Sequence, residues 1–211
     1  MLFIMIFMAF FGVSGAFDSH EAQAAMFDGV RFVNPGEFAI SIEPEFVLRS
    51  PAGLGGDFRY TQGISDLSNL TVIAGIGNGT RQSRIGADYT FDFFPDLEGQ
   101  PGIGIALQGL WVQVISPAAS AANLTTTVGQ LELTAIPYLH KNFKTENGGE
   151  VEPFMTLPFG WAFLNGGYQQ IMSVGLGGIF KANEHFRYTL EFTMAVNNTD
   201  STVSGGVIYY H

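Results

Sequence analysis

The fold is indicated most clearly by one stretch near the end of the chain, residues 186–196, which reads FRYTLEFTMAV. Apolar residues stand at the even-numbered positions of this stretch, and polar or small residues stand between them. A period of two is the pattern of a β-strand with one apolar face and one polar face. About ten residues are also enough for a tilted strand to cross a bilayer. If neighbouring segments share the pattern, the chain forms a membrane barrel whose function must be read from its inward face.

The same alternation recurs along the chain, with turn residues between the runs. We predict an all-β fold, a closed antiparallel up-and-down transmembrane β-barrel of about ten strands, with eight or twelve also possible because the second and third runs are short. Pro153 and Pro158 interrupt the seventh run, so we expect that strand to bend or bulge. The predicted strands are residues 37–49, 57–64, 70–77, 82–94, 102–115, 127–142, 150–163, 168–181, 186–196 and 201–211.

Composition excludes several classes of function. The 211 residues contain no cysteine, which excludes a disulfide framework, a thiolate nucleophile and a cysteine-based zinc site. The formal net charge is −10 and no basic run occurs, which argues against a nucleic-acid partner. Only 13% of the residues are charged, whereas 20 Phe and 7 Tyr are present, as aromatic girdles at two membrane interfaces would require.

The N-terminal region predicts export from the cytoplasm. Residues 1–13 form an apolar run, and small residues follow at two sites, the second of which ends at Ala24. We interpret residues 1–24 as a secretory signal peptide, residues 25–36 as an irregular lead-in and residues 37–211 as the barrel. An uncleaved N-terminal membrane anchor is the alternative, although the apolar run is shorter than the roughly 18 residues that a spanning helix needs.

Alternation alone does not separate a membrane barrel from a soluble sandwich. Three features favour the membrane barrel: strands longer than the usual five or six residues or so, few charged residues, and the signal-like start. The expected lumen charge network is Glu43, Glu45, Arg59, Arg84, Asp88, Asp92, Glu132, His140, Arg187 and Glu191. The expected lipid-facing aromatics are Phe38, Tyr89, Phe91, Phe93, Trp111, Phe186, Tyr188 and Phe192.

Charges inside so narrow a barrel must be paired. We expect Arg59, Arg84 and Arg187 to pair with carboxylates of the same face. The expected partners are Glu43, Glu45, Asp88, Glu132 and Glu191. Such a network either fills and stabilises the lumen or lines a narrow, mildly cation-preferring pore.

The C-terminal run Gly206, Val207, Tyr209 and Tyr210 resembles the signal by which bacterial barrel-assembly machinery recognises its clients, although this chain ends in His211. Residues 60–70 and 180–186 resemble the strand–turn–strand units of small outer-membrane β-barrels of the OmpA or OmpW kind. The resemblance covers most of residues 37–211, by pattern more than by identity. It implies a bacterial outer-membrane location, outer-membrane lipid as the surroundings, and assembly through the C-terminal strand.

His140 is the one residue that invites an enzymatic interpretation, because it stands on the polar face with Glu132 and Tyr138. Some small outer-membrane barrels are lipid-modifying enzymes that use Ser, His and an acid. No Gly-x-Ser-x-Gly elbow or zinc-like spacing occurs, so we predict no catalytic residue, metal or cofactor. The predicted role is structural or a narrow pore. A lipid-modifying enzyme and a soluble secreted barrel that binds an apolar ligand remain the alternatives, and the oligomeric state stays open.

Overall fold

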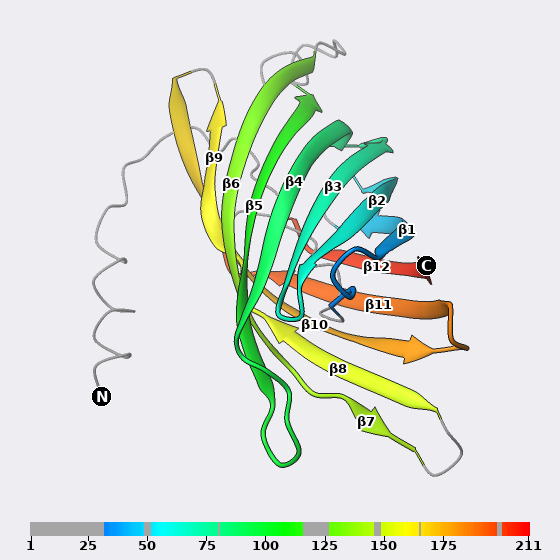
Figure 1. The fold of residues 1–211 in the computed structure, drawn as a ribbon. Coiled ribbons are helices and arrows are strands. Elements are labelled where there is room, and N and C mark those ends of the chain that lie inside the picture. Colours follow the sequence, from blue (N-terminus) through cyan, green and yellow to red (C-terminus); the bar gives the residue numbers. More distant parts are fainter. Residues whose placement is uncertain are drawn as a thin grey trace, which may run out of the picture.

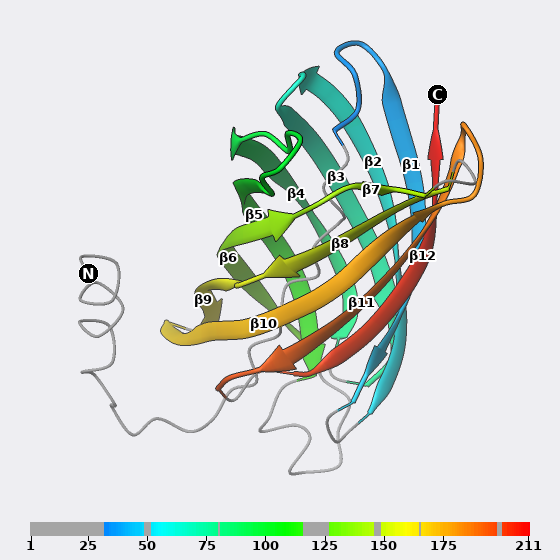
Figure 2. The same ribbon diagram turned by 90° about the horizontal axis from the view of Figure 1, so that it is seen from below.

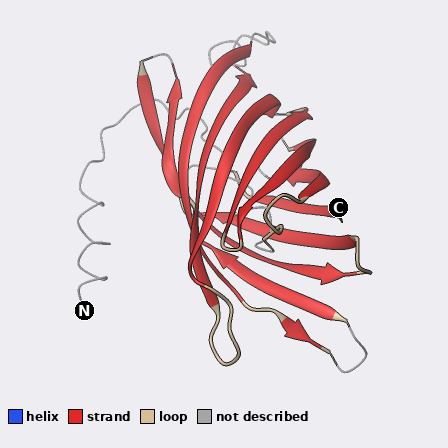
Figure 3. Cartoon of the chain, viewed as in Figure 1, coloured by secondary structure: helices blue, strands red, loops and turns tan. Residues whose placement is uncertain are grey.

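The computed structural model describes residues 32–48, 52–79, 81–115, 127–145, 149–164, 166–197 and 200–211. These residues form strands and the turns between them (Figure 3). They contain no helix that could cross a membrane. The predicted signal peptide, residues 1–24, and residues 25–31 of the lead-in lie outside the described residues. The strands are β1 (Phe38–Val47), β2 (Gly53–Ser65), β3 (Ser68–Gly77), β4 (Arg81–Phe94), β5 (Gly102–Ile115), β6 (Thr127–His140), β7 (Phe143–Lys144), β8 (Glu150–Thr156), β9 (Phe159–Leu164), β10 (Gly167–Lys181), β11 (Phe186–Ala195) and β12 (Thr202–Tyr210).

The strands form a single antiparallel sheet that closes on itself (Figures 1 and 2). From β1 to β6, and again from β10 to β12, each strand pairs with the next one along the chain. The last strand then pairs with the first, with Tyr210 opposite Ala39 and Thr202 opposite Val47. This confirms the predicted closed up-and-down barrel. It has ten strand positions, because β8 and β9 share one position and the two-residue β7 only extends the sheet beside β8.

The seventh predicted run is interrupted at Pro158 alone, whereas Pro153 lies inside the continuous strand β8, and the expected bulge is not found. The strand is broken between β8 and β9, yet its register with β6 and with β10 is the same on both sides of the break. Two backbone hydrogen bonds join the broken segment to its neighbouring strands. The Leu157 N–H donates to the Pro137 carbonyl of β6 at 2.9 Å, and the Ser173 N–H of β10 donates to the Pro158 carbonyl at 3.0 Å. The break is therefore a local loss of donors and not a shift of the chain.

In most strands the polar face points inward and the apolar face points outward. In β5 the inward face also carries the buried apolar residues Leu110, Val112 and Val114. In β11 the large apolar residues at even positions, from Phe186 to Met194, are between 38% and 55% exposed. Between them, Arg187, Glu191 and Thr193 are buried, and Thr189 is half-buried. This arrangement is the reverse of a soluble barrel, whose apolar face lies inside. A continuous exposed apolar exterior around a polar interior is the surface of a transmembrane β-barrel.

The predicted strand ends are least accurate where glycines replace the alternating side chains. The second strand begins at Gly53, earlier than the predicted residue 57, because residues 53–56 include three glycines that leave little pattern to read. Residues 53–56 nevertheless pair with β1, Val47 opposite Gly53. The backbone ladder, which does not depend on side chains, extends the strand here.

The two ends of the barrel carry different segments of the chain. The terminus end carries Phe38 at the start of β1, Tyr210 at the end of β12, and the connections at residues 66–67, 95–101 and 182–185. The connection between β6 and β8, which contains β7, lies at the same end (Figure 2). The opposite end of the barrel is called the far end.

Candidate functional site in the charged lumen

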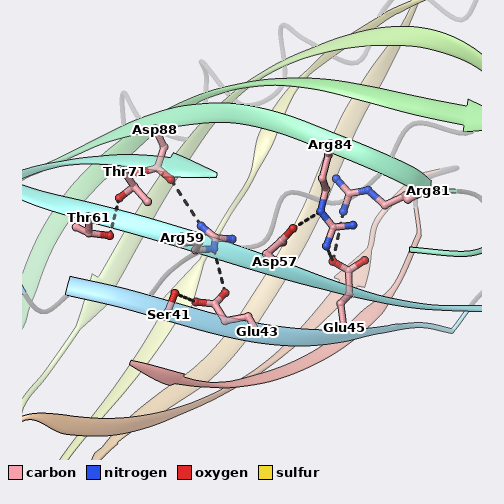
Figure 4. A network of polar contacts seen from close by, with 10 residues as sticks. All are labelled: Ser41, Glu43, Glu45, Asp57, Arg59, Thr61, Thr71, Arg81, Arg84 and Asp88. Atoms are coloured by element: carbon pink, nitrogen blue, oxygen red, sulfur yellow. Dashed lines mark hydrogen bonds and ion pairs between the residues drawn. The ribbon is translucent and has the colours of Figure 1, made fainter. Parts of the chain in front are cut away.

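The middle of the lumen is built around Arg59 of β2. Its side chain is 1% exposed, with Nε 3.0 Å from Glu43 Oε2 of β1 and Nη1 3.7 Å from Asp88 Oδ2 of β4 (Figure 4). The Ser41 hydroxyl donates a hydrogen bond to Glu43 Oε1 at 2.6 Å. The Thr90 hydroxyl donates to Asp88 Oδ1 at 3.3 Å. One guanidinium thus contacts a carboxylate of the neighbouring strand β1 and a carboxylate of β4, which lies beyond β3 on the other side. These contacts hold β1, β2 and β4 together on the inner surface.

A second cluster lies nearer the far end and has two arginines. The Arg84 guanidinium of β4 donates to Asp57 Oδ1 of β2 at 2.5 Å and to Glu45 Oε2 of β1 at 2.9 Å (Figure 4). Arg81 lies 3.5 Å from the same Glu45 oxygen and 3.7 Å from Glu132 Oε2 of β6. All five side chains are buried. The cluster therefore links four strands across the lumen.

A glycine makes the contact between Arg84 and Asp57 possible. Gly75 of β3 stands between them in register, opposite Asp57 on one side and Arg84 on the other. A Cβ atom at Gly75 would lie 2.0 Å from Asp57 Oδ1 and 2.7 Å from Arg84 Nε. The missing side chain lets two charged groups from strands that are not neighbours meet above the β3 backbone.

A third cluster, near the terminus end, is centred on His140 of β6. Its Nδ1 lies 2.9 Å from Glu152 Oε1 of β8, and its Nε2 lies 3.1 Å from Asp92 Oδ2 of β4. The Tyr138 hydroxyl donates to Asp92 Oδ1 at 2.7 Å. Gly102 of β5 lies directly under the imidazole, since a Cβ there would be 2.1 Å from Nε2. As at Gly75, a glycine in the intervening strand allows a cross-strand contact.

Arg187 of β11 belongs to a fourth group, at the rim of the terminus end. Its Nη1 lies 3.5 Å from Glu150 Oε2, and Lys181 Nζ lies 3.1 Å from the other oxygen of that carboxylate. The guanidinium also lies 5.3 Å from the centre of the Tyr210 ring, a cation–π distance. The structure thus pairs Arg187 with Glu150, which was not among the expected partners.

The structure places all the expected network residues on the inner face, and buries them. It brings Glu43 and Asp88 to Arg59, and Glu45 to Arg84. It does not bring Glu132 to His140, because Glu132 contacts Arg81 in the cluster nearer the far end. Glu191 accepts a hydrogen bond from the Thr193 hydroxyl at 3.1 Å.

Sequence reasoning missed several members of these clusters. Arg81 lies just before the predicted start of its strand, and Glu152 lies in the proline-containing run whose alternation was irregular. Asp57 stood on the polar face of its run, and this was the signal that could have identified it. The buried acidic and basic side chains of the described residues are nine carboxylates, four arginines and one histidine, so the interior does not suit an anionic solute.

The expected lipid-facing aromatics all lie on the outer face. Six of them are exposed, whereas Phe38 and Phe91 are half-buried. Trp111 of β5 and Trp161 of β9 lie toward the far end, and Phe186 lies at the terminus end. Between Phe186 and Val196, ten residue steps of about 3.4 Å at a tilt of about 40° give a height of about 26 Å. An outer apolar band of transmembrane barrels is about 25 Å tall.

The geometry around His140 does not build a nucleophile. Both ring nitrogens face carboxylates, so neither is directed at a hydroxyl that it could deprotonate. Among the described residues no group of three or more histidine and acidic side chains is arranged to hold a metal ion. The contacts that these side chains make place His140 of β6 between carboxylates of β4 and β8.

Comparisons with known proteins yield similarity at the level of fold. No description of a known protein family matches the chain, and no curated protein matches it. A designed transmembrane β-barrel is 12% identical, with 84% of this chain and 98% of that chain covered and a TM-score of 0.38. An outer membrane channel from Pseudomonas putida F1 is 6% identical, with 88% and 100% covered and a TM-score of 0.49. The translocator domain of the autotransporter NalP from Neisseria meningitidis is 9% identical, with 82% and 87% covered and a TM-score of 0.41.

Proposed function

We propose that the protein is a bacterial outer-membrane β-barrel with a closed lumen, and that its role is structural and non-conducting. The burial of inward side chains along the lumen is the observation that supports this proposal most. Inward side chains from strands on all sides of the lumen are almost completely shielded from water. They include Glu45 at 0%, Arg59 at 1%, Val112 at 0%, Glu132 at 2%, Thr156 at 0%, Ile171 at 0% and Thr193 at 0% exposure.

These values favour a filled lumen over a pore. A side chain that lines a water-filled channel keeps contact with water, whereas these side chains contact each other. A barrel of ten strands is only slightly wider than the eight-stranded size that side chains fill completely. The long Arg and Glu side chains reach across the remaining width, and their pairing compensates for the loss of hydration.

The same observations bear on the alternative functions. A narrow cation-preferring pore would use the same acidic lining, but it requires a continuous wetted path. A soluble barrel for an apolar ligand would need an apolar interior, whereas this interior carries ion pairs. A lipid-modifying enzyme would need a reactive hydroxyl at His140, and carboxylates occupy both ring nitrogens there. Resemblance to the OmpA or OmpW kind, export by a signal peptide and assembly through the C-terminal strand stay predictions.

Conductance in planar bilayers tests the closed lumen. The purified full chain is reconstituted, and its insertion is verified independently by heat-modifiable gel migration and by protease protection of vesicle-inserted protein. We expect no stable channel events from protein that has inserted. Reproducible openings of defined size would overturn the proposal and favour the narrow pore. A folded monomer that stays in solution without detergent would overturn the membrane location.

A further inference from the structure

The described end of the lead-in, residues 32–36, turns into the barrel at the terminus end. Val33 is only 2% exposed and packs in a cluster with Ala39 of β1 and Ile208 of β12. Its backbone N–H donates a hydrogen bond to Asn69 Oδ1 of β3 at 3.1 Å. A residue that precedes the first strand is thereby tied to the inner wall of the barrel.

The neighbouring residue contacts the opposite part of the wall. Phe32 packs against a buried apolar cluster contributed by β5, β6, β8 and β10. Two consecutive residues of the lead-in therefore touch wall strands on different sides of the lumen, and the segment crosses the mouth. The cluster under Phe32 consists of Ala106, Ile136, Tyr138, Phe154 and Ile179.

Gly63 of β2 provides a backbone cradle for the same segment. A Cβ atom at Gly63 would lie 2.2 Å from the Asn34 carbonyl oxygen and 2.3 Å from the Val33 carbonyl oxygen. The Gly63 N–H donates to the Glu37 carbonyl at 3.1 Å, and the Gly36 N–H donates to the Gly63 carbonyl at 3.4 Å. Because both contacts are backbone atoms, a side chain at residue 63 cannot be accommodated unless the lead-in moves.

We infer that the terminus-end mouth of the barrel is a socket that binds an extended peptide through the apolar cluster under Phe32, called the pocket below, and through a glycine cradle, and that residues 32–36 of this chain occupy it. The inference rests on the proposed closed lumen and adds a second, separable seal to it. Phe32 fills the pocket, and the backbone of residues 33–34 lies against Gly63. Displacement of the lead-in exposes the pocket to water, whereas the deeper ion pairs around Arg59 and Arg84 stay in place.

Two single-cysteine reporters separate the two seals. The chain contains no cysteine, so an introduced thiol is the only one present. Ala106→Cys places a thiol in the pocket under Phe32, where Ala106 is 2% exposed. Ser173→Cys places one midway along β10, where Ser173 is also 2% exposed. Each is made in the full chain and treated with a water-soluble maleimide after reconstitution into vesicles.

Two substitutions perturb the socket. Gly63→Ala adds a methyl group that displaces the backbone of residues 33–34. Phe32→Ala removes the ring that packs against the apolar cluster and leaves the strand residues unchanged. Gly56→Ala on the same strand is the control, because a Cβ there would have its closest neighbour at 3.7 Å. We expect either perturbation to speed labelling of Ala106→Cys by at least about tenfold, the ratio that corresponds to about 1.4 kcal/mol. The control and the Ser173→Cys reporter should show no change.

Two outcomes overturn different statements. If Ala106→Cys stays equally protected in Gly63→Ala and Phe32→Ala proteins that show heat-modifiable migration of folded barrels, the lead-in does not seal the mouth and the socket is wrong. If Ser173→Cys reacts rapidly in the otherwise unchanged chain, the lumen is open and the proposed closed barrel fails, whatever the first reporter shows.

Discussion

Replacing Arg59 by methionine is the most informative perturbation of the lumen. Methionine keeps an unbranched side chain of similar reach and removes the charge, so the packing changes little while two buried carboxylates lose their guanidinium. Glu43 and Asp88 are 2% and 6% exposed and lie 3.0 and 3.7 Å from Arg59. At an effective dielectric constant of about 20, these distances correspond to gross attractions of about 5.5 and 4.5 kcal/mol.

Only part of this attraction is net stability, because the charges lost their hydration when the barrel formed. Breaking a buried ion pair by removal of one partner costs about 3–5 kcal/mol, since the remaining charge is left buried and uncompensated. With two carboxylates affected, we expect Arg59→Met to lower the free energy of unfolding by about 3–5 kcal/mol. Neutralising the carboxylates as well, in Arg59→Met/Glu43→Gln/Asp88→Asn, should recover most of the loss.

Urea unfolding of the vesicle-inserted barrel, followed by the emission of its 2 Trp, measures this difference. Trp111 and Trp161 are 51% and 38% exposed on the outer face, so their emission reports loss of the lipid surroundings. The exposed Lys144 provides the control, since Lys144→Met should change stability by less than about 0.5 kcal/mol. A loss below about 1 kcal/mol for Arg59→Met, or no recovery in the triple variant, would refute the buried network.

Three further changes probe the spacer glycine, the cluster at the terminus end and a rim contact. Gly75→Ala places a methyl group within 2.7 Å of Arg84 Nε, and it should cost about 1–3 kcal/mol in the same unfolding assay as the Arg84 ion pair separates. Tyr138→Phe removes the hydroxyl that donates to a buried carboxylate at 2.7 Å, and a loss of about 1.5–3 kcal/mol is expected; a neutral result would count against that bond. In the loop after β4, burial is the largest single effect on the pKa of Asp96 and raises it. The hydrogen bonds from Lys141 and from the Asn142 N–H, together with the nearby positive charge, outweigh it, so the pKa lies below its ordinary value of 3.8. The contact should therefore persist between about pH 5 and 7 and be lost only as the pH falls through the lowered pKa. Amide NMR shifts of residues 96–100 would show this, and a change in these shifts near neutral pH would contradict it.

The barrel itself was predictable because its main signal is local. Alternation along residues 186–196 identifies a strand, its two faces and a membrane-crossing length without any knowledge of neighbouring strands. The sequence narrowed the break in this strand to two positions, since Pro153 and Pro158 each remove a ladder donor; the structure breaks the strand at Pro158 and keeps Pro153 inside β8. The start of β2 could not, because residues 53–56 carry too few side chains to reveal the period.

The pairing of charges was harder to predict, because it depends on register across the sheet. Arg84 meets Asp57 only because Gly75 stands between them, and no pattern within one strand shows which residue of the next strand lies opposite. The contact between Arg187 of β11 and Glu150 of β8 at the rim likewise joins residues of different strands, so no pattern within one strand predicts it. The sequence predicted an irregular lead-in at residues 25–36 but not its packing. Phe32 and Val33 are two apolar residues in an irregular segment, and only the buried clusters of distant strands show what they contact.

The central claim is that the exposed apolar face of the barrel meets lipid and that the inward side chains fill a closed lumen. Labelling two cysteines on β11 tests it most directly, Leu190→Cys on the outer face and Thr193→Cys on the inner face, which are 55% and 0% exposed. In vesicles, we predict that a lipid-soluble maleimide labels Leu190→Cys and that a water-soluble maleimide labels neither thiol. Rapid reaction of Thr193→Cys with the water-soluble reagent, or protection of Leu190→Cys from the lipid-soluble one, would contradict the account.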